Sequence, residues 1–524
     1  MTAGFAAALE RLPEYLGWHV LLSASALALG LAISLPLAVA ASRSARLRWP
    51  LLAFAGLIQT IPSLALLALF YPLLLALSAA SKAVFGAGFS ALGFLPSLLA
   101  LTLYSMLPIL RNTVAGLGGV DPAVREAADA MGMTPAQKLF QVELPLAAPV
   151  IMAGIRTAAV WTIGAATLST PVGQTSLGNY IFAGLQTENW VFVLFGCVAS
   201  AALALAADQL LGLVEAGLRR RRRGLVLAGA AGLGLGIAVA LLPLALVSVG
   251  PPGRAAAPAS YVIGAKNFSE QYILAELMAG RLERAGARVK RKDNLGSSVA
   301  YRALAAGEID AYVDYSGTLW TNVLGRTDNP GRQAVLDQLT AELDRRDRVR
   351  LLGSLGFENA YAFAMRADRA RQLRIASIAD LSAQAPRLRL GSDLEFLSRP
   401  EWKAVEAAYG LRFRGATSYQ PTFMYRALAG GEADVISAFS SDGRIAAEGL
   451  VTLSDPRGAI PPYDAVVLIS PARRDDPRLL AALAPLIGKV PVEAMRAANY
   501  SVDRDAGKAS PAQAARRLET DLGL

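Results

Sequence analysis

The chain has 524 residues, of which 54 % are hydrophobic and 18 % charged, and its formal net charge is +10. This length allows several domains. The only cysteine is Cys197 and the only histidine is His19, which excludes an intramolecular disulfide and a cysteine metal cluster. We therefore expect no cofactor and no metal site. Much of the positive charge lies in arginines beside long apolar segments, so we expect no nucleic-acid partner.

Six apolar segments are long enough to cross a bilayer, which takes about 20 helical residues. They run over residues 18–41, 51–78, 91–110, 146–169, 190–213 and 225–249. Prolines inside them are expected to kink the helices, namely Pro36, Pro62, Pro72 and Pro108. Two charged residues, Arg156 and Asp208, are expected near the cytoplasmic boundary. The sequence predicts a multi-pass protein of the cell (inner) membrane, with the lipid bilayer as its surroundings.

Basic residues fall on one side of the predicted membrane. They follow the first, third and fifth segments, as Arg43, Arg46 and Arg48, then Arg111, Arg125 and Lys138, then the run of residues 219–223. Cytoplasmic loops carry this excess of lysine and arginine. We therefore expect these loops inside, and both the N-terminus and everything after the sixth segment outside, in the periplasm of a Gram-negative cell.

A polar stretch, residues 121–145, interrupts the apolar segments. Asp121 is a good N-cap and Pro122 suits a first helical position, while Gly132 is a typical helix end. Thr134 and Pro135 begin a second helix, which we expect Pro145 to close. The stretch predicts two short helices with a glycine elbow at the membrane surface.

The same stretch resembles the EAA loop of ABC-importer permeases. The resemblance is carried by Glu126, Ala127, Ala128, Gly132, Leu144 and Pro145, with Val142 where that family usually has Ile. It implies that these residues couple the chain to a separate ATPase subunit, with two ATPase copies and a second copy of this chain in the complex. The chain contains no G-x-x-x-x-G-K-[ST] phosphate loop of its own. The alternative is a generic amphipathic loop between membrane helices.

The domain organisation expected is residues 1–224 as a permease domain with five membrane helices, residues 225–260 as a sixth helix with a linker, and residues 261–524 as an exported domain. The linker, residues 251–260, is rich in Pro, Ala and Gly. Because arginines precede the sixth segment and Ala255–Ala257 follow it, cleavage after a signal-like segment stays open.

Short strands alternate with helices after residue 260. We expect strands at residues 261–265, 287–290, 309–313, 411–414 and 434–439, crossover strands at 361–365 and 465–469, and helices at 270–284 and 298–305. This alternation predicts an α/β domain with largely parallel sheets. Lobe 1 covers about residues 261–360 and 465–524 and lobe 2 about 365–464, which makes a hinged clamp. The fold class expected is a six-helix membrane bundle followed by a two-lobed, type II-like binding-protein domain.

Five blocks in this half resemble the osmoprotectant-binding proteins of glycine betaine, choline and carnitine importers. They begin at Lys266, Gly307, Glu358, Gly430 and Pro461. With the EAA loop, they imply an ABC permease fused to its own substrate-binding protein, which is a transport component and not an enzyme. The implied ligand is a small quaternary amine.

A quaternary ammonium has no N–H to donate, so aromatic faces must recognise it. By the matching blocks, the resemblance implies hydrogen bonds from Gln271, Thr318 and Asn359 to a polar tail, and a cage of aromatic rings. The aromatic residues near the strand ends are Tyr315, Trp320, Tyr361, Tyr419, Phe439 and Tyr463. Of these, the resemblance implies Tyr361, Phe439 and Tyr463 as the cage. Phe439 stands where the family usually has Tyr, and residues 331–343 lack a further cage tyrosine. Asp442 is expected to cap the next helix.

Three functions follow from these features. The leading one is an ATP-driven importer of quaternary-amine solutes, with a related betaine such as ergothioneine as an alternative ligand. A membrane-anchored solute sensor is a second, but the chain has no cytoplasmic effector domain to receive a signal. An exported enzyme on a membrane anchor is a third, and it would have to work with carboxylates alone because His19 and Cys197 lie in the membrane half.

Overall fold

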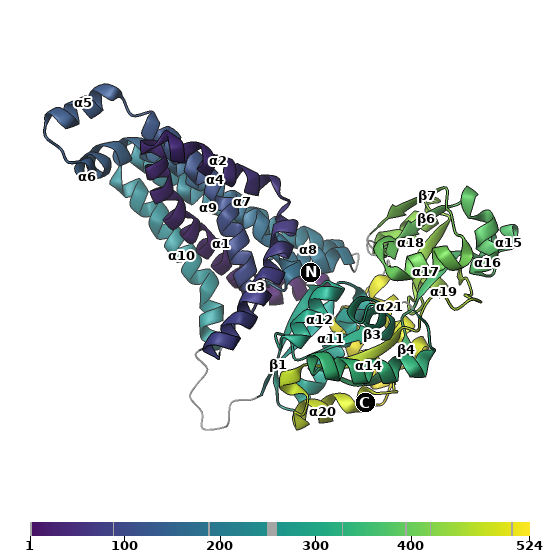
Figure 1. Ribbon diagram of the computed structural model, residues 1–524. Coiled ribbons are helices and arrows are strands. Elements are labelled where there is room, and N and C mark those ends of the chain that lie inside the picture. The colour runs from purple at the N-terminus through teal and green to yellow at the C-terminus, as the bar shows by residue number, and fades with distance from the viewer. Residues whose placement is uncertain are drawn as a thin grey trace. The chain divides into compact units, whose positions relative to one another are not determined.

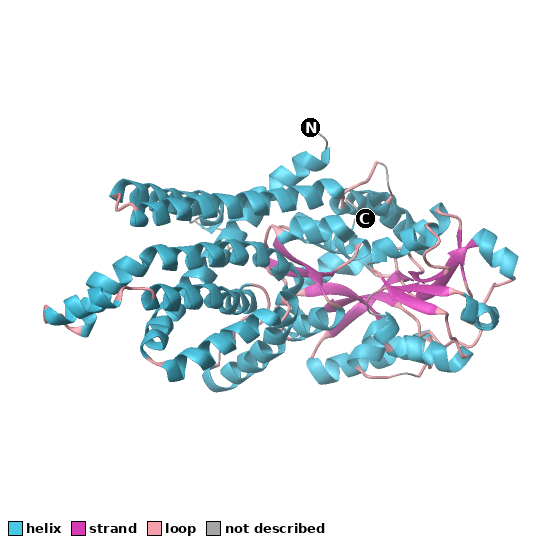
Figure 2. Ribbon diagram, turned by 90° about the horizontal axis from the view of Figure 1, so that it is seen from above, coloured by secondary structure: helices cyan, strands magenta, loops and turns pink. Residues whose placement is uncertain are grey.

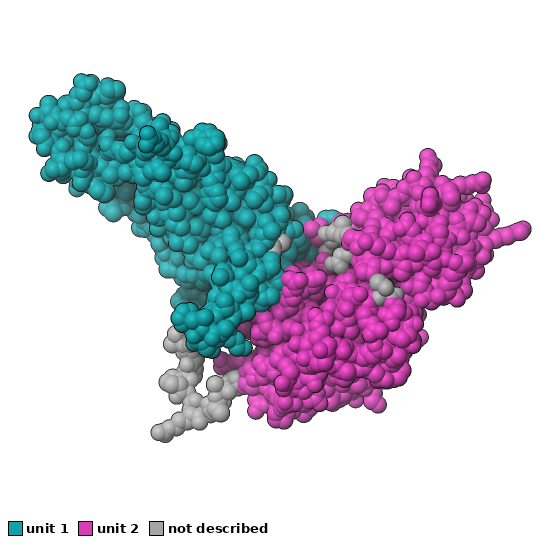
Figure 3. Space-filling model, viewed as in Figure 1, with its two compact units in different colours: residues 1–182, 190–253 teal, residues 183–189, 254–524 magenta. Residues whose placement is uncertain are grey.

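The structure, a computed structural model, describes residues 3–86, 88–186, 189–248, 259–326, 328–393, 396–419, 421–504 and 507–524. The chain forms two compact units, one of residues 1–182 and 190–253 and one of residues 183–189 and 254–524 (Figure 3). The first is helical, and the strands all lie in the second (Figure 2).

The N-terminal part is built from helices (Figure 1). They are α1 (Ala3–Arg43), α2 (Ala45–Thr60), α3 (Ser63–Phe85), α4 (Phe94–Gly118), α5 (Pro122–Ala130), α6 (Pro135–Gln137), the π-helical turn η1 (Lys138–Glu143), α7 (Leu144–Ala166), the 3-10 turn η2 (Thr167–Val172), α8 (Gly178–Gln186), α9 (Trp190–Arg219) and α10 (Arg223–Ser248). Six helical stretches of the described chain are long and apolar enough to span a membrane. α1 packs on α4, α4 on α7, α7 on α9, α9 on α10, and α10 on α1.

The second predicted span, residues 51–78, is wrong as one helix. It divides into α2 and α3 at Ile61 and Pro62, whose backbones are extended (ψ 126° and 134°). A proline disfavours the helical conformation of the residue before it, so Pro62 ends one helix instead of bending it. Pro36, Pro72 and Pro108 do lie inside helices, in α1, α3 and α4.

The expected helix end at Pro145 is also wrong. Helical backbone runs from Pro135 through α6, η1 and α7 to Val172. Pro145 is in the first turn of α7, directly after the π-helical turn. Proline has no N–H and its ring presses on the preceding turn, and the wider π turn relieves that crowding, so the helix continues.

The second unit contains two five-stranded sheets. The first has the order β2 (Arg288–Leu295), β1 (Ser260–Lys266), β3 (Ala311–Tyr315), β10 (Asp464–Ile469), β4 (Arg350–Glu358), and the second has the order β7 (Gly415–Ser418), β6 (Arg389–Ser392), β8 (Val435–Phe439), β5 (Tyr361–Arg366), β9 (Leu450–Thr452). Together with the six apolar spans, this confirms the predicted fold class.

Helices cover these sheets in both lobes. They are α11 (Ser269–Arg284), α12 (Ser297–Ala305), α13 (Ser316–Thr318) with the π turn η3 (Leu319–Val323), α14 (Arg332–Asp347), α15 (Ala367–Leu373), α16 (Ile378–Gln384), α17 (Pro400–Tyr409), α18 (Pro421–Ala429), α19 (Arg444–Ala447), α20 (Pro477–Leu483), α21 (Val492–Asp503) and α22 (Pro511–Asp521). Short 3-10 turns are η4 (Ala385–Arg387), η5 (Phe396–Ser398), η6 (Pro471–Arg473) and η7 (Ala484–Leu486).

Both sheets are mixed, which corrects the expectation of largely parallel sheets. β1 pairs parallel with β2 and β3, whereas β10 pairs antiparallel with β3 and β4. The second sheet repeats this pattern, with β5 antiparallel to β8 and β9. The chain changes lobe at residues 359–360 and 453–463, and the strand that enters each sheet after a crossing runs against its neighbours. Residues 411–414 form no strand, because the edge strand β7 begins only at Gly415.

This topology brings the ends of several strands to the boundary between the lobes, among them the end of β4 at Glu358. β1, β3 and β8 end there and β5 and β10 begin there. Tyr315 at the end of β3 is opposite Ala465, and Tyr361 at the start of β5 is opposite Phe439. Side chains far apart in the sequence therefore meet between the two sheets.

Candidate ligand-binding site

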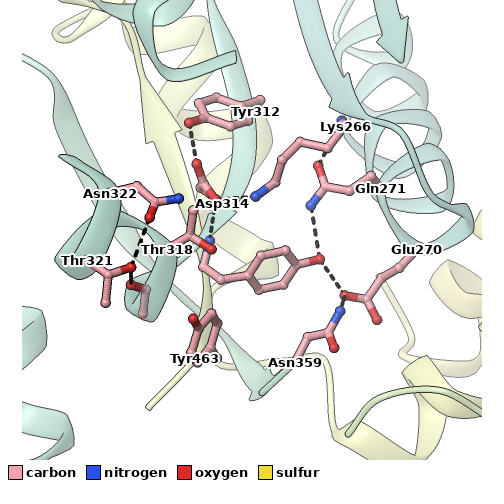
Figure 4. Close-up of polar contacts among 12 residues, drawn as sticks. Lys266, Glu270, Gln271, Tyr312, Asp314, Thr318, Thr321, Asn322, Asn359 and Tyr463 are labelled. Carbon is pink, nitrogen blue, oxygen red and sulfur yellow. Dashed lines mark hydrogen bonds and ion pairs between the residues drawn. The ribbon is translucent and has the colours of Figure 1, made fainter. Parts of the chain in front are cut away.

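Gln271, Tyr315 and Asn359 belong to one buried network around Glu270 (Figure 4). Glu270 Oε1 accepts hydrogen bonds from the Tyr315 hydroxyl at 2.6 Å and from Asn359 Nδ2 at 3.0 Å, and its Oε2 accepts one from Asn499 Nδ2 at 2.8 Å. Gln271 Nε2 donates to the Tyr315 oxygen at 3.0 Å. Two of the three side chains expected to bind a ligand's polar tail, Gln271 and Asn359, are therefore bonded to Tyr315 and Glu270, and the third, Thr318, accepts a hydrogen bond from Arg399 instead.

Burial sets the protonation of this network. It raises the pKa of the Glu270 carboxyl, against the opposing effect of the hydrogen bonds that Glu270 accepts. Burial also raises the pKa of the Tyr315 phenol well above its usual value, and the neighbouring Glu270 charge adds to this. Tyr315 therefore keeps its proton at neutral pH and acts as a donor.

Lys266 and Asp314 form a buried ion pair beside this network. Lys266 Nζ lies 2.5 Å from Asp314 Oδ1, with 3 % and 1 % of their side chains exposed. Lys266 Nζ also lies 4.8 Å from the centre of the Tyr315 ring. One face of Tyr315 is thus already occupied by a cation of the protein, which limits what this ring can offer a ligand.

The three predicted cage residues, Tyr361, Phe439 and Tyr463, form an aromatic cluster. The Tyr361 ring centre lies 5.2 Å from that of Phe439 and 5.8 Å from that of Tyr463, the second pair edge to face. Two further rings extend the cluster: Phe396 lies 4.8 Å from Tyr361, and Phe268 lies parallel to Phe439 at 6.3 Å. Sequence reasoning missed both, although Phe268 lies inside the first matching block.

A buried arginine lies at this cluster, and sequence reasoning missed it as well. The Arg399 guanidinium is 5.3 Å from the centre of the Tyr361 ring, and its Nη2 donates to Thr318 Oγ1 at 3.2 Å. Arg399 pairs with Glu401 at 3.2 Å, with 6 % and 0 % of the two side chains exposed. The signal was an Arg-Pro-Glu sequence between Phe396 and Trp402, in a segment rich in aromatic residues.

Glu401 ties the arginine to the rest of the site. It accepts hydrogen bonds from Thr321 Oγ1 at 3.0 Å and from the Tyr463 hydroxyl. Arg399 and Glu401 belong to the lobe with β6, and Thr318 and Thr321 to the lobe with β3. The pair therefore links the two lobes across the aromatic cluster.

A cavity of about 30 Å³ lies beside the cluster, lined by Phe268, Glu270, Asn359, Phe439 and Asn499 among others. Within the residues that the structure describes, the Oδ1 atoms of Asn359 and Asn499 are buried without a hydrogen-bond partner. Buried polar atoms normally have one. These two oxygens can therefore accept hydrogen bonds from water or a ligand.

Asp442, expected to cap a helix, lies at the start of α19. Its Oδ1 accepts a hydrogen bond from the Arg444 backbone N–H at 2.9 Å, and its Oδ2 pairs with the Arg444 guanidinium at 2.6 Å. Asp442 thereby holds the turn that follows Phe439.

The candidate coupling loop has the first short helix and the elbow expected of it, whereas its second helix continues into α7. Asp121 caps α5 by accepting a hydrogen bond from Ala123 N–H, and Gly132 has a φ of +72°. Glu126 and Ala127 are exposed and Ala128 is buried; beyond the elbow, Pro145 is exposed and Leu144 is half-buried. Two large apolar side chains of the loop are exposed as well, Met131 at 75 % and Phe140 at 67 %.

Glu143 fastens this loop to the helices. Its side chain, 5 % exposed, pairs with Arg43 at the end of α1 and with Arg125 of α5, the latter at 3.4 Å. Arg125 also donates to the carbonyl of Leu117 in α4. One buried carboxylate thus joins α1, α5 and the start of α7.

Comparison with known proteins separates the chain into the same two parts. Residues 30–220 match the family described as binding-protein-dependent transport system inner membrane component. Residues 259–518 match the family described as substrate binding domain of ABC-type glycine betaine transport system.

Curated relatives include proteins of both arrangements. The ergothioneine transport permease/ergothioneine binding protein EgtU of Helicobacter pylori (strain G27) is 29 % identical over 483 residues, which cover 90 % of this chain and 84 % of that protein. The choline transport system permease protein OpuBB of Bacillus subtilis (strain 168) is 40 % identical over 207 residues, 38 % of this chain and 88 % of that protein. A crystal structure titled glycine betaine/carnitine/choline ABC transporter is similar over 50 % of this chain and 98 % of its own, with 26 % identity and a TM-score of 0.44.

Proposed function

Because the chain belongs to the ABC importers whose membrane permease carries a glycine-betaine-type substrate-binding domain, we propose that it captures a quaternary-amine solute and passes it across the membrane. In this proposal residues 1–248 are the permease and residues 259–524 are the receptor. The receptor lies outside the cell, which the one-sided distribution of arginines in the loops supports.

The ligand class rests on one observation, the Arg399 guanidinium over the Tyr361 ring in a cluster with Phe439 and Tyr463. Tyr361 already accepts a cation on its face. A ligand's trimethylammonium group can replace it there, since each cation–π contact contributes about 0.5–2 kcal/mol. The displaced guanidinium then remains close enough to pair with a carboxylate. A betaine, which carries both groups, fits this arrangement better than choline, which lacks the anion.

Ergothioneine is a second candidate, favoured by the unpartnered Oδ1 of Asn359. Unlike glycine betaine, ergothioneine has ring N–H groups that need acceptors. Asn359 lies beside Phe439 in the wall of the small cavity and offers one. The fused ergothioneine permease of Helicobacter pylori, which matches most of this chain, supports the same candidate.

Titration calorimetry on the purified full chain tests the proposal with glycine betaine, carnitine, choline and ergothioneine. Arg399→Met is expected to weaken the carboxylate-bearing ligands about 10- to 100-fold, since bonds to charged groups contribute about 1.5–3 kcal/mol. Choline affinity should change less than about 3-fold. Phe439→Ala should weaken every ligand that binds, and Phe439→Tyr, which keeps the ring, should not. Equal losses for choline and glycine betaine in Arg399→Met would contradict the betaine assignment, and no binding of any of the four would contradict the function.

We further propose that the loop of residues 121–145 docks a separate ATPase subunit. Met131 and Phe140 are large apolar side chains exposed on this loop, and exposed apolar side chains that lie together mark partner surfaces. The coupling residues are Glu126, Ala127, Ala128, Gly132, Leu144 and Pro145. A second copy of this chain completes the path of the solute through the membrane, and each copy binds one ATPase subunit.

Uptake of radiolabelled solute by cells with and without the gene separates import from a membrane-anchored sensor. An importer raises the initial rate of uptake when its ATPase is present. A sensor would leave uptake unchanged while still binding the solute.

A further inference from the structure

Arg156 of α7 forms an ion-pair cluster with two carboxylates of α9. Arg156 donates to both oxygens of Asp208, Nε to Oδ1 at 2.9 Å and Nη2 to Oδ2 at 2.8 Å, and its Nη1 donates to Glu215 Oε2 at 2.7 Å. Gly212 lies under the guanidinium, where a Cβ atom would be 3.3 Å from Arg156 Cζ. One arginine and two carboxylates give the cluster a formal charge of −1.

Arg156 and Asp208 are expected near the cytoplasmic boundary, and both belong to helical stretches that are long and apolar enough to span a membrane. Arg156 is near the middle of the span Pro135–Val172, and Asp208 is inside the span Trp190–Arg219. At 1.5 Å per residue, Arg156 is about 18 Å along the helix from Leu144, and Asp208 is about 16 Å from Arg219.

The charged side chains of the cluster are partly exposed. Arg156 has 30 % of its side chain exposed, Asp208 23 % and Glu215 18 %. Hydrocarbon cannot solvate such groups, and charges within membrane spans face a water-filled path or protein. This face of α7 and α9 therefore does not face lipid.

Two hollows lie along this face, and Trp161 lines both. The first, of about 410 Å³, is lined by Ala153, Arg156, Thr157, Val160, Trp161, Asp208 and Glu215. The second, of about 320 Å³, lies toward the other end of α7 and is lined by residues 59–63, Tyr104, Trp161 and Ala165. Residues 59–63 include the break between α2 and α3. The Trp161 side chain is 54 % exposed, so its ring is available between the two hollows.

We propose that Trp161, Asp208 and Glu215 form a second solute site, within the membrane unit, for a quaternary ammonium group in transit. This rests on the proposed function, which supplies the ligand class. The carboxylates attract the cation into the first hollow, and the indole face stabilises it on the way to the second. A site made of one aromatic ring and a partly neutralised charge binds the solute weakly. Weak binding suits a site that the solute passes through more than one that captures it.

A cysteine placed in the first hollow tests this in the full chain in lipid nanodiscs. Thr157→Cys is made in a Cys197→Ser background, because the native cysteine is exposed. Two thiol reagents of opposite charge are compared, the trimethylammonium-bearing and the sulfonate-bearing ethyl methanethiosulfonates. The cationic reagent is itself a quaternary ammonium. It is expected to react about 3- to 10-fold faster than the anionic one, once their rates are normalised to those with a free thiol.

Three variants and a competitor make the result specific. Glu215→Gln should bring the rate ratio close to one, whereas Glu215→Asp, which keeps the charge, should preserve it. Tetramethylammonium chloride should slow the reaction more than sodium chloride at the same concentration, and Trp161→Leu should remove this protection. Leu205→Cys, on α9 outside both hollows, serves as the control for a position away from the site.

Lack of reaction at Thr157→Cys with both reagents would overturn the proposal, because the hollow would then be closed by lipid or protein. A ratio that does not respond to Glu215→Gln would overturn it equally. Either result leaves ligand binding by the receptor unaffected, so calorimetry distinguishes this failure from failure of the proposed function.

Discussion

Asp503, at the end of α21, shows how the charge of a single residue depends on the contact between the lobes. Its Oδ1 accepts a hydrogen bond from Ser269 Oγ at 2.5 Å. Burial raises the pKa of the Asp503 carboxyl to about 6, against the opposing effect of Arg444 and with a further increase from Asp442. Arg444 and Asp442 come from the other lobe, so part of the environment that determines this pKa depends on the contact between the lobes.

The raised pKa predicts that the receptor loses stability as the pH rises. An aspartate in the unfolded chain titrates near 3.8. Between there and about 6 the folded state binds more protons than the unfolded state, so the free energy of unfolding falls across this window and stays lower above it. Over this whole window the loss from Asp503 is about 3 kcal/mol, since each pKa unit corresponds to about 1.36 kcal/mol. Glu270, whose pKa burial also raises, adds to it with the same sign.

Unfolding of Asp503→Asn at pH 4.5 and pH 7 checks this. The variant should show a smaller fall between the two pH values than the native chain, measured by urea unfolding and tryptophan fluorescence. Asp475→Asn is the matched control, because the Asp475 side chain is 77 % exposed. A fall of the same size in Asp503→Asn and the native chain would show that this carboxyl is not responsible.

At the scale of elements, the elbow between α5 and α6 depends on one backbone conformation. Gly132 has a φ of +72°, and a Cβ atom there would meet nothing within 4 Å. The positive φ, and not a lack of space for a side chain, therefore favours glycine at position 132. Asparagine adopts such φ values more easily than other non-glycine residues, and β-branched residues adopt them least.

Substitutions at the elbow are expected to separate coupling from binding. Gly132→Val and Gly132→Asp should abolish or strongly reduce solute uptake, while Gly132→Asn should retain a substantial part of it. Calorimetry should give the same solute affinity for all three variants. Equal uptake by Gly132→Val and the native chain would argue against a coupling role for the elbow.

The buried carboxylate of Glu143 is the second element-scale feature, since it joins α1, α5 and the start of α7. Glu143→Gln keeps the shape of the side chain but leaves Arg43 and Arg125 without their ion-pair partner. Because the Arg43 and Arg125 side chains are 45 % and 33 % exposed, the loss is expected to be smaller than the about 3–5 kcal/mol of a fully buried pair. We expect α5 to detach more often, so trypsin should cleave the loop after Arg125 and Lys138 faster, as mass spectrometry of the fragments can measure.

The control for that experiment is Asp129→Asn in the same loop. Its ion pair with Lys138 is largely exposed on the Asp129 side, 57 %, and exposed pairs contribute little. It should change the cleavage rate less than Glu143→Gln does. The reverse order would contradict a fastening role for Glu143.

At the scale of the whole molecule, one chain combines a receptor and a permease, and the motor is expected on another chain. Purified chain in proteoliposomes is therefore expected to bind solute but to show no solute-stimulated ATP hydrolysis. Adding the ATPase subunit should confer both hydrolysis and uptake. ATP-driven uptake by this chain alone would refute the separate motor.

The sequence by itself determined those features that depend on short, local patterns of residues. Apolar length predicts the membrane spans, and the spacing of Glu126, Gly132 and Pro145 identifies the permease loop. Five blocks in order identify the receptor, and the family matches confirm that the chain contains a permease domain and a receptor domain. These features are readable because each depends on neighbouring residues or on the thickness of a bilayer.

Contacts distant in sequence were decided only by the tertiary structure. Arg399 contacts Tyr361 and Thr318 because the two lobes meet at the site, and the aromatic residues beside Arg399 in the sequence do not show which residues it contacts. Arg156 and Asp208 are likewise 52 residues apart in the sequence, and only the packing of α7 on α9 shows that they form an ion pair. The sequence alone does not show the role of a charged residue. Its partner and its exposure determine the free energy that its burial costs and the groups that it can bind.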